Sequence, residues 1–78
     1  MTMSTTVTMT VTMTVTVNGQ PVELPAQATV ADLLVQLGKS AVPCAVEVNK
    51  AVVRKRDHAA AALKPADTIE IVTLVGGG

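Results

Sequence analysis

The sequence contains no phenylalanine, tyrosine or tryptophan, although 49% of its 78 residues are hydrophobic. Its core must therefore be built from aliphatic side chains, with methionine filling gaps, and a chain of this length forms one small domain. Six basic and six acidic residues cancel, so there is no excess of charge of either sign. Nucleic-acid-binding domains normally carry a basic excess and often stack bases on aromatic rings. We therefore expect no nucleic-acid partner.

Cysteine and histidine are almost absent, with only Cys44 and His58. One cysteine excludes an internal disulfide, and the pair supplies too few ligands for a cysteine-based zinc site, so we predict no metal site. For Cys44 we favour a small apolar packing role over a sulfur-bearing thiol. For His58 we favour a helix cap or a surface position over a general base, because no nucleophile lies near it in the sequence.

Long apolar runs and targeting signals are also missing. No stretch approaches the roughly 18 consecutive apolar residues of a membrane-spanning helix, so we predict no membrane partner. The first residues are rich in threonine and lack the basic region and compact apolar run of a secretory signal. We expect a cytoplasmic protein.

The N-terminal tract alternates almost strictly, with valine and methionine on one face and threonine on the other. A period of two predicts a half-buried strand, yet ordinary strands run only about 5–6 residues. Because Asn18-Gly19 is a strong hairpin signal, we place the first strand at about residues 13–17 and its return at residues 20–24. Residues 1–12 then form an N-terminal Thr/Val/Met extension, which is either disordered or prolongs an edge strand.

A short helix is predicted after this hairpin. Thr29 is placed as its N-cap, with Asp32 three residues later completing a capping box. Gly38 stands where a glycine commonly ends a helix. Apolar residues between these signals recur at helical spacing and form one stripe. The stripe consists of Val30, Leu33, Leu34 and Leu37.

Further strands are predicted at residues 44–49, 51–53 and 68–74, separated by a solvated basic turn at residues 54–57 and one or two helical turns at residues 58–63. A helix with one apolar stripe needs a sheet face to cover it. The fold class is therefore α+β. We expect a β-grasp domain over residues 13–75, with a mixed sheet of four to five strands and one main helix packed across it. The first and last strands should lie parallel at its centre.

The last strand leads into three glycines. Ile69 and Ile71 should face the helix. The residues that should face outward are Thr68, Glu70, Val72 and Leu74. An outward apolar surface beside the end of the strand suggests partner docking. This candidate docking surface consists of Val72, Leu74 and Val75. Glycine has no side chain and accepts positive φ, which suits a flexible tail that presents a carboxylate. The candidate tail consists of Gly76, Gly77 and Gly78.

From about residue 13 onward the chain resembles the ubiquitin-like sulfur carrier proteins of thiamine biosynthesis, the ThiS family. The matching stretches are Val17-Asn18-Gly19, residues 29–34, 45–49 and 52–53, Arg56-Asp57-His58, residues 67–72, and Val75-Gly76-Gly77-Gly78. Two turns depart from the family pattern. Arg54-Lys55-Arg56 stands where Pro-Arg often follows the paired valines, and Ala66-Asp67 stands where Gly-Asp is common.

The resemblance implies a carrier rather than an enzyme, with no catalytic residue and no bound cofactor of its own. An E1-like adenylyltransferase of the ThiF type would use ATP to adenylate the carboxylate of Gly78. A sulfur donor, a cysteine desulfurase or similar enzyme, would then convert it to a thiocarboxylate. A thiazole synthase of the ThiG type would accept the sulfur for thiazole formation.

Two alternatives remain open at the level of sequence. The small subunit of molybdopterin synthase, or another thiocarboxylate carrier, would share the fold and the chemistry but serve another acceptor. A non-covalent β-grasp interaction module would instead bind through a sheet edge or through the threonine-rich extension, and its terminus would stay unmodified.

Overall fold

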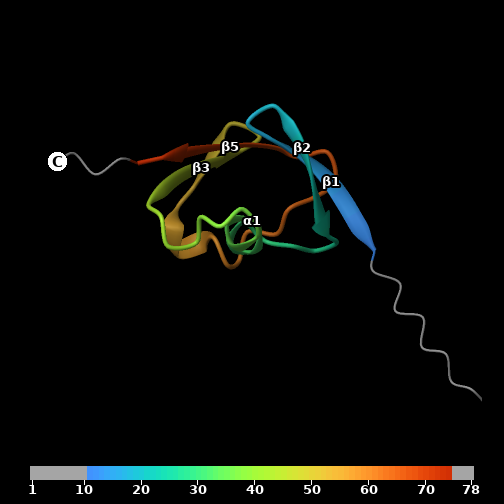
Figure 1. Cartoon of the computed structure of the whole chain (residues 1–78), viewed down its shortest axis with the longest axis horizontal. Coiled ribbons are helices and arrows are strands. Elements are labelled where there is room, and N and C mark those ends of the chain that lie inside the picture. The colour runs from blue at the N-terminus through green and yellow to red at the C-terminus, as the bar shows by residue number, and fades with distance from the viewer. Residues whose placement is uncertain (1–10, 75–78) are drawn as a thin grey trace, which may run out of the picture.

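The computed structural model describes residues 11–74, which form a five-stranded mixed sheet with one α-helix packed across one face (Figure 1). The strand order is β2-β1-β5-β3-β4. The elements are β1 (Thr12–Val17), β2 (Gln20–Pro25), α1 (Val30–Gln36), β3 (Cys44–Val48), β4 (Ala51–Val53), a 3₁₀ helix (Lys55–Asp57) and β5 (Thr68–Thr73). This arrangement confirms the α+β class and the helix-on-sheet plan expected of a β-grasp domain.

The threonine-rich tract supplies β1, which begins at Thr12, one residue before the predicted start. Met13, Val15 and Val17 are buried against the helix, and the threonines between them face the other side. The chain reverses at Asn18-Gly19, where both residues have positive φ (49° and 81°), as a two-residue hairpin turn requires. Most of the predicted N-terminal extension, residues 1–10, lies outside the described residues.

The first and last strands lie side by side, as predicted. β1 and β5 run parallel through the pairs Thr16–Thr68 and Val17–Ile69. β3 flanks β5 on its other side and pairs with it antiparallel along its whole length. Ile69 has a paired strand on each side and packs into the core with the helix, so it has no exposed surface. β5 is therefore the central strand, and it leads directly to the candidate tail.

The helix begins and ends at the residues that the sequence predicted. The backbone N–H of Asp32 donates to Thr29 Oγ1 at 3.2 Å, and the N–H of Thr29 donates to Asp32 Oδ2 at 2.8 Å, which completes the capping box. Gly38 follows the helix with φ 71°. The apolar stripe packs on the sheet, with Val30 and Leu33 fully buried and Leu34 nearly so. No helix in the described range 11–74 is long and apolar enough to span a membrane.

The prediction of helical turns at residues 58–63 is wrong. The short helix lies earlier, at Lys55–Asp57, and residues 58–63 run beside the start of α1. The carbonyls of His58 and Ala61 accept the N–H groups of Ala31 and Val30, both at 3.0 Å. The first N–H groups of a helix have no partner within it. The carbonyls of His58 and Ala61 satisfy two of these N–H groups. Residues 58–63 therefore bond to α1 instead of forming a second helix.

Candidate functional site

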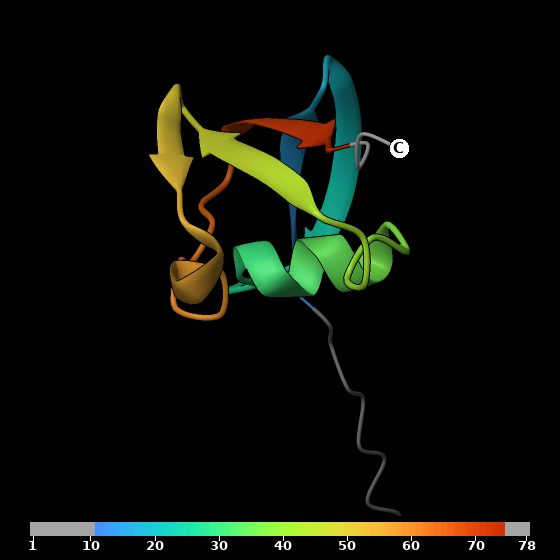
Figure 2. The ribbon, with the colours of Figure 1, turned by 90° about the vertical axis from the view of Figure 1, so that its left-hand side faces the viewer.

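The end of β5 separates a buried face from an exposed one. Ile69 and Ile71 are buried under the helix, whereas Val72 and Leu74 are 58% and 51% exposed. The exposed residues lie on the outer face of the sheet, which Figure 2 shows turned away from α1. The predicted division of this strand is therefore confirmed. Val75 and the three tail glycines, Gly76, Gly77 and Gly78, lie outside the described residues, so their roles remain predictions.

The second half of β5 has a strand neighbour on only one side. β1 stops at Val17 because the chain turns back at Asn18-Gly19, so its pairing with β5 ends at Ile69. Beyond that point, β3 alone pairs with β5, up to the pair Cys44–Thr73. The opposite edge of β5 thus needs another source of hydrogen bonds.

The side chain of Asn18 supplies these bonds. Its Nδ2 donates to the carbonyl of Ile71 at 3.0 Å, and its Oδ1 accepts the N–H of Ile71 at 2.8 Å. Its backbone N–H also donates to the carbonyl of Ile69 at 2.9 Å. The amide therefore replaces a missing strand residue beside β5. The sequence predicted Asn18 only as a turn residue, because its partner lies 53 residues away and no local spacing links them.

Asn49, in the turn between β3 and β4, supports the beginning of the same strand. Its Oδ1 accepts the N–H of Thr68 at 2.9 Å, and its Nδ2 donates to Asp67 Oδ1 at 2.9 Å. Like Asn18, it has a positive φ, here 50°. Two hairpin asparagines thus bond to β5, one at its first residue and one at Ile71. Because Leu74 N–H also donates to the Pro43 carbonyl at 2.8 Å, the strand is anchored up to the last described residue.

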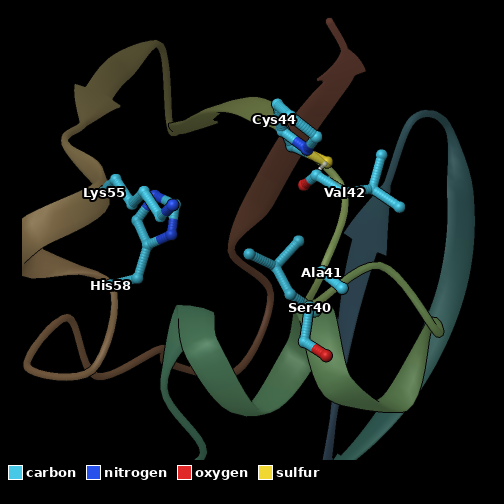
Figure 3. A pocket seen from close by; sticks show the side chains of 8 residues that line it. Ser40, Ala41, Val42, Cys44, Lys55 and His58 are labelled. Atoms are coloured by element: carbon cyan, nitrogen blue, oxygen red, sulfur yellow. Dashed lines mark hydrogen bonds between the residues drawn. The ribbon is translucent and has the colours of Figure 1, made fainter.

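Cys44 and His58 line one small cavity of about 140 Å³, shown in Figure 3. Cys44 is half-buried, packs against the core and donates its thiol to the Val42 carbonyl at 3.2 Å, which agrees with the predicted packing role. His58 is buried rather than at the surface. Its Nε2 lies 3.1 Å from the Val53 carbonyl, and its backbone caps the 3₁₀ helix, so the predicted cap is confirmed.

The thiol and the imidazole lie on opposite sides of this cavity. Figure 3 shows Cys44 and Val42 on one side of the cavity and His58 with Lys55 on the other. In the described part of the chain, each of the two groups makes its hydrogen bond to a backbone carbonyl, not to the other group. Among residues 11–74, no three His, Cys, Asp or Glu side chains gather to hold a metal ion. The candidate functional site is therefore the end of β5 rather than this cavity.

The chain matches the ThiS family and is similar to proteins named thiazole synthase. The sequence profile of the ThiS family matches residues 15–78. A protein named thiazole synthase from Magnetococcus marinus is 43% identical over 61 residues, covering 78% of this chain and 19% of its own length. A second thiazole synthase, from Paramagnetospirillum magneticum, is 39% identical over 62 residues, covering 80% and 19%. The chain thus spans about a fifth of the length of these relatives.

Two solved structures of a thiamine biosynthesis protein from Geobacter metallireducens have a similar fold. The crystal structure, described as ThiS, superposes with a TM-score of 0.70 at 30% identity and covers 85% of this chain and all of that one. The solution structure superposes with a TM-score of 0.68 at 33% identity and covers 85% and 88%.

Proposed function

The chain belongs to the ThiS family, and from this premise we propose that it is a sulfur carrier of thiamine biosynthesis. The observation that carries the proposal is the family match over residues 15–78, which includes β5 and the three glycines. The fold shared with the thiamine biosynthesis protein of Geobacter metallireducens supports it. In this proposal the working group is the carboxylate of Gly78.

The proposed chemistry takes place in two stages. Adenylation joins the Gly78 carboxylate to the α-phosphate of ATP and releases pyrophosphate, which turns a poor electrophile into an acyl group with a good leaving group. The terminal sulfur of a persulfide then displaces AMP and forms an acyl disulfide. A thiol reductant cleaves the S–S bond of that disulfide, and the sulfur stays on Gly78 as a thiocarboxylate. An E1-like adenylating enzyme and a desulfurase-type donor would catalyse these steps.

The chain itself contributes position rather than acid–base chemistry. Glycine residues lack a Cβ and accept most backbone conformations, so they suit a tail that enters a narrow active site. An extended residue spans about 3.3–3.6 Å, which gives three glycines a reach of roughly 10 Å. The hydrogen bonds from Asn18 and Asn49 hold the strand that precedes this tail. The exposed Val72 and Leu74 would dock on the enzyme that receives it, with Val75 extending the same surface.

Thiazole synthase is the proposed acceptor of the sulfur. Support comes from the two thiazole synthases that contain a segment similar to this chain, since a carrier-like segment within such an enzyme suits delivery to it. The acceptor is identified by genetics. Deletion of the gene should produce a thiamine requirement and leave molybdoenzyme activity intact, whereas loss of molybdoenzyme activity would favour the molybdopterin alternative.

Intact-mass measurement tests the chemistry directly. The protein is incubated with the adenylating enzyme from the same organism, ATP and sodium sulfide, a simple source of the sulfur nucleophile. The expected mass change is the exchange of one oxygen for one sulfur, located at Gly78 by fragmentation. A variant without Gly77 and Gly78 serves as the control. An unchanged mass in the intact protein, or equal modification of the shortened variant, would refute the proposal. The mass before incubation checks that Gly78 carries a free carboxylate.

A further inference from the structure

The charges of this neutral chain are sorted between the sheet and its connections. All charged residues within the five strands are glutamates, namely Glu23, Glu47 and Glu70. Every lysine and arginine lies in a loop, a turn or the 3₁₀ helix. The three glutamates are exposed and alternate with residues that face the helix, so all of them lie on the outer face of the sheet. The face that carries Val72 is therefore acidic, which the net charge of zero conceals.

Two of these glutamates lie directly opposite each other. Glu47 on β3 pairs with Glu70 on β5. In an antiparallel ladder, every second residue pair is hydrogen-bonded. The pairs Pro43–Leu74 and Asn49–Thr68 are hydrogen-bonded, because Leu74 N–H donates to the Pro43 carbonyl and Asn49 N–H donates to the Thr68 carbonyl. The same alternation makes Glu47 and Glu70 a hydrogen-bonded pair, whose Cα atoms are about 5.5 Å apart. Like charges at this position destabilise a sheet.

Neither glutamate forms an ion pair in the part of the chain that the structure describes. The one ion pair among those residues joins Arg56 to Asp57, at 4.0 Å and on the surface. Glu47 and Glu70 are neighbours of exposed apolar residues on the same face. Ala45 pairs with Val72 on one side of them, and Val52, which is 71% exposed, pairs with Glu47 on the other. An acidic pair without an ion-pair partner thus lies within an apolar surface that continues toward Leu74.

We propose that the outer face of β3 and β5 docks the adenylating enzyme, and that a lysine or arginine of that enzyme enters between Glu47 and Glu70. This inference rests on the proposed function. The adenylating enzyme is the partner that takes up the tail after β5, and a cationic group at that contact would complement the acidic pair. Burying Val72 and Val52 would exclude water from the charged contact. The same contact would relieve the repulsion that the free protein retains.

The test is a binding measurement that does not depend on sulfur transfer. The fluorescently labelled protein is titrated with the adenylating enzyme from the same organism, without ATP, at low and at high salt. The double variant E47Q/E70Q keeps the size of both side chains and removes both charges. E23Q makes the same change on the same face, two strands away from β5. Circular dichroism checks that all variants are folded, which we expect because the substitution removes a repulsion.

We expect E47Q/E70Q to bind about tenfold more weakly than the parent at low salt, and the difference to shrink at high salt because ions screen the contact. E23Q should bind as the parent does. Unchanged binding of the double variant, an equal loss in E23Q, or no binding by the parent would overturn the docking surface. If the parent binds in this way but gains no sulfur in the mass experiment, the proposed function fails and the docking surface stands.

Discussion

Replacing Asn18 by glycine tests whether its side chain completes the sheet beside β5. Asn18 has φ 49°, and glycine adopts this conformation without a steric penalty. N18G therefore removes the two bonds to Ile71, of 3.0 and 2.8 Å, and leaves the turn unstrained. N18A removes the same bonds but keeps a Cβ in the left-handed conformation, which costs about 1–2 kcal/mol relative to glycine.

The expected loss of stability is a large part of the total. A net contribution of about 0.5–1.5 kcal/mol for each hydrogen bond gives roughly 1–3 kcal/mol for N18G. A domain of this size has a free energy of unfolding of roughly 4–12 kcal/mol, at about 0.05–0.15 kcal/mol per residue. N18A should lose more than N18G, by about the cost of the strain.

Urea unfolding followed by far-UV circular dichroism measures these differences, since a chain without aromatic residues offers no tryptophan fluorescence. Hydrogen exchange locates them. The amide of Ile71 should exchange faster in N18G, whereas the Leu33 amide, bonded to the Thr29 carbonyl at 3.0 Å, reports only global unfolding.

N49G is the matched control, because it removes the side-chain bonds to Thr68 and Asp67 and keeps those at Ile71. It should lower stability without selectively exposing Ile71. A parent-like unfolding midpoint for N18G, together with an unchanged exchange rate at Ile71, would show that Asn18 does not support β5.

Three further predictions concern the charge pair, the helix cap and the exposed end of β5. E70Q should stabilise the free protein by about 0.2–1 kcal/mol in low-salt urea unfolding, because it removes the cross-strand repulsion; a loss of stability would contradict this. T29A should lower the free energy of unfolding by about 0.5–2 kcal/mol through the lost N-cap bond, and T29S, which keeps the hydroxyl, should recover most of it. V72S/L74S should change stability by no more than about 0.5 kcal/mol per site, since both residues are exposed, but weaken binding to the adenylating enzyme. If V72S/L74S bound the adenylating enzyme as tightly as the parent, these two residues would not belong to the docking surface.

The elements that could be predicted from the sequence are those set by contacts between near neighbours. The alternation of valine, methionine and threonine indicated β1 because side chains of a strand point to opposite faces. Thr29, Asp32 and Gly38 marked the helix because its caps form within three or four residues. The outward orientation of Val72 and Leu74 followed from the same alternation along β5.

Residues 58–63 could not be predicted in this way. Their alanines favour a helix, but their carbonyls lie beside the unpaired N–H groups of α1 and bond to those instead. The burial of His58 has the same origin, because the turn folds under β4 and places Nε2 against the Val53 carbonyl. Only the packing of this segment against α1 and β4 could decide between these two outcomes.

The sequence by itself determined the strands, the capped helix, the apolar face of each, and a family resemblance that includes the glycine tail. The tertiary structure alone decided what surrounds the strand before that tail. Asn18 meets Ile71 across 53 residues, and Glu47 meets Glu70, because the register of β5 against β1 and β3 places them there. Register depends on how whole strands align, so no local pattern around any one of these residues contains it.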